Sequence, residues 1–191
     1  MATLSPWRLV RNPYTRAAYD FLARHGVKVS KMHLYGANLD DFEAEQTAFE
    51  TVSFDVRASD ELTPPPSQDA SALTCEDDVV VAVADGDPVG FQTLSLDRAV
   101  YMSPVERELE FEAFLWGLYV TPNYRRRGIA TELIRRSLAL ARERGADEAY
   151  TLVALDNGIS KRALTTNGFE PSREVSYYKF RRFERRVERA L

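Results

Sequence analysis

The sequence predicts an α/β domain built on a mixed sheet, preceded by an extension. Strand-like stretches at 79–84 and 89–96 flank Asp85-Gly86, and an Asp-Gly pair between apolar runs is typical of an antiparallel hairpin. Further along, a strand, an amphipathic helix and a second strand follow one another, which implies parallel neighbours joined by a right-handed crossover. A length of 191 residues with 45% apolar content suits one sizeable core.

The N-terminal part predicts helices. Over 13–24 the apolar residues recur at helical spacing and Gly26 is a natural stop. Over 39–50 a second helical pattern follows Asn38 or Asp40, either of which suits an N-cap. The expected organisation is a helical extension over 1–50, the domain over 51–180 and a basic tail over 181–191.

The domain begins with a period-two pattern over 52–56, which is typical of a half-buried strand. The three prolines at 64–66 force an extended loop, which we place near the substrate entrance. After a polar stretch around Pro104, the apolar and aromatic residues of 110–120 predict another strand.

The second half has the strongest periodicity. From Ala130 to Gly145 the small and apolar residues form one continuous helical face. A strand over 149–155, a short helix over 159–166 and a closing strand over 175–180 complete the predicted domain.

Composition excludes several classes of protein. The 25 basic and 29 acidic side chains give a net charge of -4, which argues against general binding to nucleic acid or an anionic membrane. Cys75 is the only cysteine, so no intrachain disulfide can form and a cytoplasmic location fits. We expect no targeting or membrane-spanning segment, and His25 and His33 lack metal-ligand spacing.

The segment 121–130, between a strand and the best helix, carries the chemistry. A helix start leaves backbone N–H groups without internal partners and holds a partial positive charge. Gly128 and Ala130 keep the approach to this backbone open, while the arginines at 125–127 add forked donors. A diphosphate suits this turn better than a single carboxylate, and neither a Walker loop nor a dinucleotide fingerprint is present in the sequence.

The spacing Arg125-x-x-Gly128-x-Ala130, after a strand ending at Val120, resembles motif A of the GCN5-related N-acetyltransferases, the GNAT family. Downstream, Asn157, a short helix and Asn167-Gly168-Phe169 resemble the second motif of the family. The likeness covers residues 52–180, with the strands and helices in the same order.

This resemblance implies the acyl-CoA N-acyltransferase-like fold, with the sheet partly splayed between the strands of Leu118 and Ala149 and acetyl-CoA in the opening. It also implies transfer of the acetyl group to an amine by direct attack on the thioester. The expected coenzyme contacts are Leu118, Tyr119, Val120, Arg125, Arg126, Arg127, Gly128, Ile129, Ala130, Thr131 and Asn157.

Two positions depart from the family pattern. Leu164 stands where many members have a tyrosine that protonates the departing thiolate, and Gly117 stands where many have a glutamate. Tyr177 and Tyr178 on the final strand are the candidate acids, with core or interface packing as the alternative.

Glu110 and Glu112 are the candidate bases, with simple solvation as the alternative. Deprotonating a lysine amine of pKa about 10.4 costs about 4.6 kcal/mol at pH 7, whereas an α-amine near 7.7 to 8 costs about 1 kcal/mol. A site without a strong base therefore favours weakly basic amines, as a hypothesis.

The leading hypothesis is an acetyl-CoA-dependent N-acetyltransferase acting on a small-molecule or peptide amine. A non-catalytic acyl-CoA sensor and an RNA-binding protein with a basic tail are the alternatives. The tail over 181–191 favours an amphipathic helix whose arginines are solvated or paired at a homodimer contact. The loops 62–71 and 97–106 are expected to shape the acceptor site.

Overall fold

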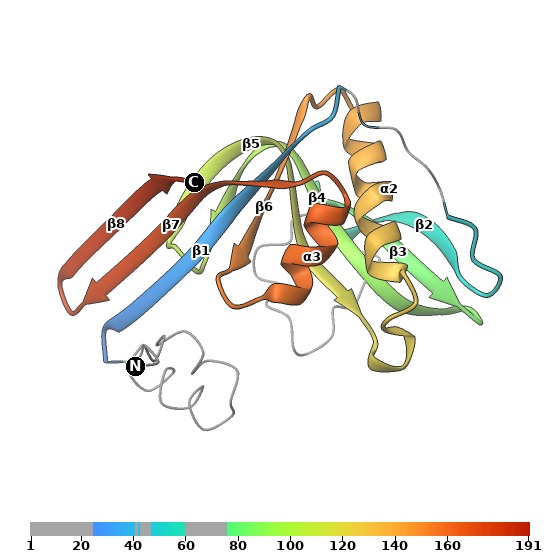
Figure 1. Ribbon diagram of the computed structural model, residues 1–191, viewed down its shortest axis with the longest axis horizontal. Coiled ribbons are helices and arrows are strands. Elements are labelled where there is room, and N and C mark those ends of the chain that lie inside the picture. The colour runs from blue at the N-terminus through green and yellow to red at the C-terminus, as the bar shows by residue number, and fades with distance from the viewer. Residues whose placement is uncertain (1–24, 41, 43–46, 60–75) are drawn as a thin grey trace.

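The computed structural model describes residues 25–40, 42, 47–59 and 76–191. Eight strands form one sheet in the order β2-β3-β4-β5-β6-β1-β7-β8, and two helices and a 3₁₀ turn complete the described part (Figure 1). The strands are β1 (Val27–Asn38), β2 (Ser53–Ala58), β3 (Asp78–Ala84), β4 (Asp87–Met102), β5 (Arg107–Val120), β6 (Glu148–Ala154), β7 (Glu170–Phe180) and β8 (Phe183–Ala190). The helical elements are η3 (Pro122–Tyr124), α2 (Ile129–Glu143) and α3 (Gly158–Thr166).

The predicted hairpin is confirmed as β3 and β4. Asp85 and Gly86 both have positive φ, at 54° and 85°, which is the backbone of a tight turn whose twist matches that of the strands. The strand expected over 52–56 is β2, which pairs with β3 at the edge of the sheet.

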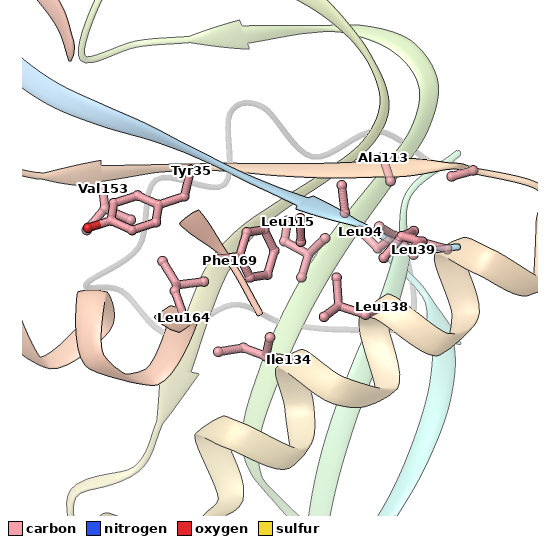
Figure 2. Packing of buried hydrophobic residues seen from close by; sticks show 14 residues of the cluster. Tyr35, Leu39, Leu94, Ala113, Leu115, Ile134, Leu138, Val153, Leu164 and Phe169 are labelled. Atoms are coloured by element: carbon pink, nitrogen blue, oxygen red, sulfur yellow. The ribbon is translucent and has the colours of Figure 1, made fainter. Parts of the chain in front are cut away.

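The helices predicted over 130–145 and 159–166 are confirmed as α2 and α3, and they cover the same face of the sheet. α2 begins after Gly128, and Gly145, with φ 93°, follows its C-terminal end. Its apolar face enters a core shared with α3 and the strands, which Figure 2 shows from close by. The labelled members from different elements include Tyr35, Leu94, Leu115, Ile134, Leu138, Leu164 and Phe169.

The sheet is mixed and splayed, as expected. β5 and β6 run parallel, but their register comprises only Ala113 with Ala149 and Phe114 with Tyr150. The other edge of β6 is fully paired with β1 from Met32 to Asn38. β5 and β6 therefore separate after their short contact, and the edge of β5 from Leu115 to Val120 is left unpaired by β6 within the described ladders.

The helical extension is wrong for residues 27–38. They form β1, an interior strand that pairs with β6 on one edge and β7 on the other. Partners more than 100 residues away in sequence make this segment a strand, and no local pattern reveals them. The helix expected over 13–24 lies outside the described residues, and the described residues of 39–50 carry no helix.

The helical tail is wrong as well. Phe183–Ala190 forms β8, which pairs antiparallel with β7 after a turn in which Arg181 has φ 55°. The loop expected over 97–106 is also mostly strand. β4 continues to Met102 and β5 begins at Arg107, so only residues 103–106 lie between the two strands. The loop expected over 62–71 lies outside the described residues.

The end of the β4–β5 hairpin folds over the face opposite the helices. Val105 is fully buried there and belongs to a core cluster that includes Val175 and Tyr177 of β7. Arg186 of β8 donates to the Glu106 carbonyl oxygen at 2.7 Å, which ties the last hairpin to the tip of the earlier one. Within the described residues, the second face of the sheet thus has a core formed by strand residues and by Val105 of the hairpin turn.

Candidate functional site

The turn between β5 and α2 has an unusual backbone. Arg126 has φ 61° and Gly128, the N-cap of α2, has φ 83°, with no side chain capping the helix. Among the described residues, no backbone hydrogen bond outside the helices and strands uses the amides of residues 126–131. The first-turn amides of a helix also lack intrahelical partners. The turn therefore presents several donors and a positive helix end, which is the arrangement that binds phosphate oxygens.

The three arginines of the turn do different things. Arg125 donates from Nε to the Val120 carbonyl oxygen at 2.8 Å and lies 6.0 Å from the Tyr119 ring centroid. It thereby fixes the turn to the end of β5. The Arg127 guanidinium lies 5.1 Å from the Tyr124 ring centroid, and Arg126 and Arg127 are both exposed. The turn is therefore positively charged, and the hydrogen bond from Arg125 to Val120 stabilises its conformation.

The unpaired edge of β5 leads directly to this turn. Thr121 donates its amide to the Val89 carbonyl oxygen at 2.8 Å, so its peptide faces β4. Peptide groups alternate along a strand, so those of Val120 and Leu118 face the opposite edge, towards β6. This is the direction in which an extended ligand can pair as an additional strand.

A bulge in β5 lies beside this edge. Gly117 has φ 70°, and the register between β4 and β5 shifts between Phe91 and Thr93. Gln92 donates from Nε2 to the Trp116 carbonyl oxygen at 2.6 Å and so fixes the irregular strand. Gly117, where the family resemblance leads us to expect a glutamate, therefore has a backbone role, and an isolated glycine in a strand is the sequence signal for it.

Trp116 is held by a buried polar network that the sequence did not reveal. Its Nε1 donates to Ser95 Oγ at 2.9 Å, and Ser95 Oγ donates to Asp77 Oδ1 at 2.6 Å. Arg98 also donates to Asp77, whose side chain is completely buried. Because Asp77 and Trp116 lie far in the sequence from Ser95 and Arg98 of β4, the spacing of the four residues gives no signal. The network fixes the indole beside the bulge.

Asn157 begins α3, as expected. Its Oδ1 accepts from the Ser160 amide at 3.3 Å and its Nδ2 donates to Ser160 Oγ at 2.7 Å. Lys161 then donates from Nζ to the Leu155 carbonyl oxygen at 2.7 Å and joins the helix to the end of β6. The Asn157 side chain is therefore engaged in its own helix cap, and its expected contact with the coenzyme stays a prediction.

The two candidate glutamates lie at the other end of β5. Glu112 Oε2 accepts from the amides of Asp147 and Glu148 at 2.9 and 3.1 Å, so this carboxylate fixes the beginning of β6. Glu110 is exposed and lines a surface groove of about 530 Å³. The remaining lining residues are Asp97, Arg98, Ala99, Phe111 and Glu112.

The two candidate tyrosines lie on β7, which β1 and β6 separate from the unpaired edge of β5. Tyr177 is fully buried, and burial raises its pKa above the ordinary value. Its neighbour Tyr178 points to the opposite face and is 37% exposed. Strands lie about 4.8 Å apart, so both tyrosines are about 10 Å or more from the opening beside β5.

His33 lies on β1 between Val153 of β6 and Glu174 of β7. Burial and the nearby Lys161 ammonium lower its pKa, while Glu174 acts in the opposite direction. Neutral histidines bind metals, but the described residues contain no group of three or more His, Cys, Asp or Glu side chains suited to a metal ion. Within the same part of the chain, no helix is both long enough and apolar enough to cross a membrane.

The comparisons with known proteins agree with this geometry. Residues 39–169 match the Acetyltransferase (GNAT) family. An aminoglycoside N(6')-acetyltransferase type 1 of Acinetobacter genomosp. 13 is 45% identical over 67 residues, which are 35% of this chain and 46% of that protein. The Salmonella typhimurium protein of the same description is 31% identical over 101 residues, 53% of this chain and 68% of that one. The chain thus spans about half the length of the first relative.

Solved structures share the fold. A putative GNAT acetyltransferase of Novosphingobium aromaticivorans superposes with a TM-score of 0.58 at 19% identity, covering 81% of this chain and 65% of that one. A tandem GNAT protein from the clavulanic acid biosynthesis pathway gives a TM-score of 0.57 at 16% identity, covering 89% and 59%. With the family match across most of the domain and the splayed sheet, the chain belongs to the GNAT acetyltransferase family.

Proposed function

We propose that this protein is an acetyl-CoA-dependent N-acetyltransferase whose acceptor is a small molecule with several amines, of the aminoglycoside class. The single observation that carries the coenzyme half is the continuity of two binding surfaces. The unpaired edge of β5 ends at Val120, and the donor-rich turn before α2 follows within a few residues. A pantetheine arm along β5 therefore leads its diphosphate to the turn.

The predicted coenzyme contacts divide between these surfaces. In the proposal, the Leu118 peptide group and the Val120 amide, with Tyr119 between them, pair with the pantetheine arm, while the Val120 carbonyl oxygen stays bonded to Arg125. The amides from Arg126 to Thr131, including Ile129, hold the diphosphate at the helix start. The Arg125 amide already donates to the Pro122 carbonyl oxygen at 3.4 Å, so Arg125 contributes the charge of its side chain. Asn157 lies at the end of β6, on the other side of the opening.

The acceptor half is supported by relatives and by charge. The relatives named above are aminoglycoside N(6')-acetyltransferases, and aminoglycosides are polycations. The groove on the β4–β5 hairpin has three carboxylates, from Asp97, Glu110 and Glu112. Its one cation, Arg98, is paired with the buried Asp77. In the proposal, this groove attracts the protonated amines that do not react.

The proposed chemistry is direct attack. The acceptor nitrogen attacks the thioester carbonyl, the C–S bond breaks, and the proton lost by the amine goes to the departing thiolate through solvent. Glu110 and Glu112 orient the cationic acceptor in this scheme and do not act as bases. Glu112 already accepts hydrogen bonds from two backbone amides, which hold its carboxylate in place. Tyr177 and Tyr178 have no role in proton transfer, because they lie two strands away from the opening. Catalysis then depends on alignment of the reactants.

Calorimetric titration with coenzyme A and acetyl-CoA tests the coenzyme half. Gly128→Val forces a branched side chain into a backbone with φ 83° and is expected to weaken binding at least 100-fold. Gly145→Val is the matched control, because Gly145 has φ 93° at the other end of the same helix. The control is expected to lose stability but keep its affinity. Equal affinity in both variants contradicts the proposed site.

Release of free thiol from acetyl-CoA tests the acceptor half. Aminoglycosides are expected to accelerate release more than spermidine or a lysine-containing peptide of similar charge. Binding of acetyl-CoA without thiol release for any amine favours the acyl-CoA sensor instead. The sensor keeps some support because Leu164, at the usual acid position, is a buried core residue.

A further inference from the structure

A buried carboxylate lies in the first turn of α2, close to the proposed diphosphate site. The side chain of Glu132 is only 1% exposed. Its Oε1 accepts from Arg136 Nε at 2.8 Å, and its Oε2 accepts from the Thr47 amide at 3.2 Å. A negative charge at this place opposes a phosphate on the same helix end, so its presence beside an anion site requires an explanation.

The Thr47 contact leads back to the turn. Two residues after Thr47, the Phe49 ring packs at the helix start, where a Cβ added to Gly128 would lie 3.7 Å from Phe49 Cζ. Phe49 also meets the Phe54 ring edge-on, with centroids 5.3 Å apart. Glu132 therefore holds a segment that forms one wall of the turn.

Arg136 completes the arrangement. It neutralises Glu132 one helical turn later, and its guanidinium lies 4.6 Å from the centroid of the Phe54 ring. The ion pair is buried on the carboxylate side and partly exposed on the guanidinium side. The two groups thus form a neutral unit that also contacts the aromatic side chain packed on Phe49.

We infer that Glu132 and Arg136 are positioning residues for the diphosphate site. Glu132 holds residues 47–49 against the turn at Gly128. Arg136 neutralises the negative charge of Glu132, which would otherwise repel phosphates bound at the same helix end. Neither residue needs to touch the ligand. The inference rests on the proposed function, because it concerns the same anion-binding turn.

The inference predicts an order of coenzyme A affinities among variants that a general loss of folding does not produce. Arg136→Met leaves a buried carboxylate without its partner, and that charge repels the diphosphate. The double variant Glu132→Gln with Arg136→Met has no such charge, although it carries one more substitution. It is therefore expected to bind coenzyme A more tightly than the single variant.

Dissociation constants for coenzyme A, inorganic pyrophosphate and pantetheine test this ordering. Arg136→Met is expected to weaken coenzyme A and pyrophosphate about tenfold, and the double variant to recover most of that loss. Pantetheine, which has no phosphate, is expected to keep its affinity throughout. Arg142→Met is the matched control, because Arg142 ties the Phe42 carbonyl oxygen to the far end of α2 at 2.6 Å.

Equal affinities of the single and double variants for pyrophosphate overturn the inference, as does a parallel loss for pantetheine. If Arg136→Met does not fold, Thr47→Pro provides the test, since it removes the amide that Glu132 accepts. A several-fold loss of coenzyme A affinity in that variant supports the inference, and an unchanged affinity overturns it. Wild-type protein that binds no coenzyme A instead overturns the proposed function, and the inference with it.

Discussion

The two ends of β5 have opposite chemistry. After Val120 the strand leads to arginines, exposed amides and a helix start, all of which attract anions. Before Ala113 the same strand carries Glu110 and Glu112 beside a groove. Glu112 lies eight positions before Val120, which is about 26 Å along a strand. A single strand thus separates a region suited to a diphosphate from a region suited to polyamines, and the bulge at Gly117 lies between them.

The ends also differ in how they are built. The anion end is formed by consecutive residues from Thr121 to Ala130, and Phe49 packs against Gly128 as a wall from elsewhere in the sequence. The acidic end depends on distant partners, because Glu112 fixes the beginning of β6 and Arg98 needs Asp77. Substitutions at the first end are therefore expected to change ligand binding, and substitutions at the second to change both binding and stability.

Asp77→Asn is expected to have the largest effect. It removes the charge that compensates Arg98 and disturbs the hydrogen bonds of Ser95, so the middle of β5 loses its support. Breaking such a pair costs about 3 kcal/mol, which a urea unfolding curve measures. Asp55→Asn, in an exposed pair with Arg57, is the control and is expected to change stability by less than about 1 kcal/mol. Similar losses for both variants contradict the role of the network.

Arg125→Ala is expected to weaken acetyl-CoA binding about tenfold, because the turn loses its hydrogen bond to the Val120 carbonyl and a positive charge. Arg127→Ala removes an exposed charge that has no hydrogen bond to the backbone of the described residues, and it is expected to have a smaller effect, about threefold. The Michaelis constant for acetyl-CoA measures both. A larger effect for Arg127→Ala contradicts the stabilising role of the Arg125–Val120 hydrogen bond. It assigns the main side-chain contact with the diphosphate to the exposed Arg127 guanidinium.

Glu110→Gln tests the acidic end. Since Glu110 is exposed, its loss is expected to raise the Michaelis constant for a polycationic acceptor about threefold at low salt and to leave that for acetyl-CoA unchanged. Glu108→Gln, an exposed acid on the same strand outside the groove, is the control. The difference between the variants is expected to vanish in high salt. If Glu110→Gln and Glu108→Gln raise this Michaelis constant equally, the groove is not part of the acceptor site.

The same contrast explains what the sequence predicts. The turn at 125–130 is encoded in consecutive residues, so its spacing and its small residues identify it without any knowledge of partners. The helices of 129–143 and 158–166 are encoded by their own periodicity. The separation of β5 from β6 is predicted only through the family resemblance, which the motifs in these elements support.

The missing parts are those that depend on distant contacts. β1 contains apolar residues such as Leu34 and Tyr35, but only its pairing with β6 and β7 makes it an interior strand. β8 is rich in arginine and suits a surface helix equally well until β7 is placed beside it. The network around Asp77 joins residues up to 39 positions apart, and no spacing rule links them.

The smallest expected effect lies at the tip of the β4–β5 hairpin, just before β5 begins. Lys28 donates from Nζ to Glu106 Oε1 at 2.6 Å, and this hydrogen bond lowers the pKa of the glutamate below 4.5. A depressed carboxyl pKa gives stability that is present above about pH 4.5 and is lost as the pH falls through the value in the folded protein. Lys28→Met is therefore expected to reduce stability slightly at pH 7 and hardly at all at pH 3. Because both side chains are partly exposed, the difference is expected to be a fraction of about 1 kcal/mol, measured by urea unfolding at the two pH values. A loss of equal size at both pH values assigns the contribution of Lys28 to its hydrogen bond with the Ser103 carbonyl oxygen, at 3.2 Å, and not to its ion pair with Glu106.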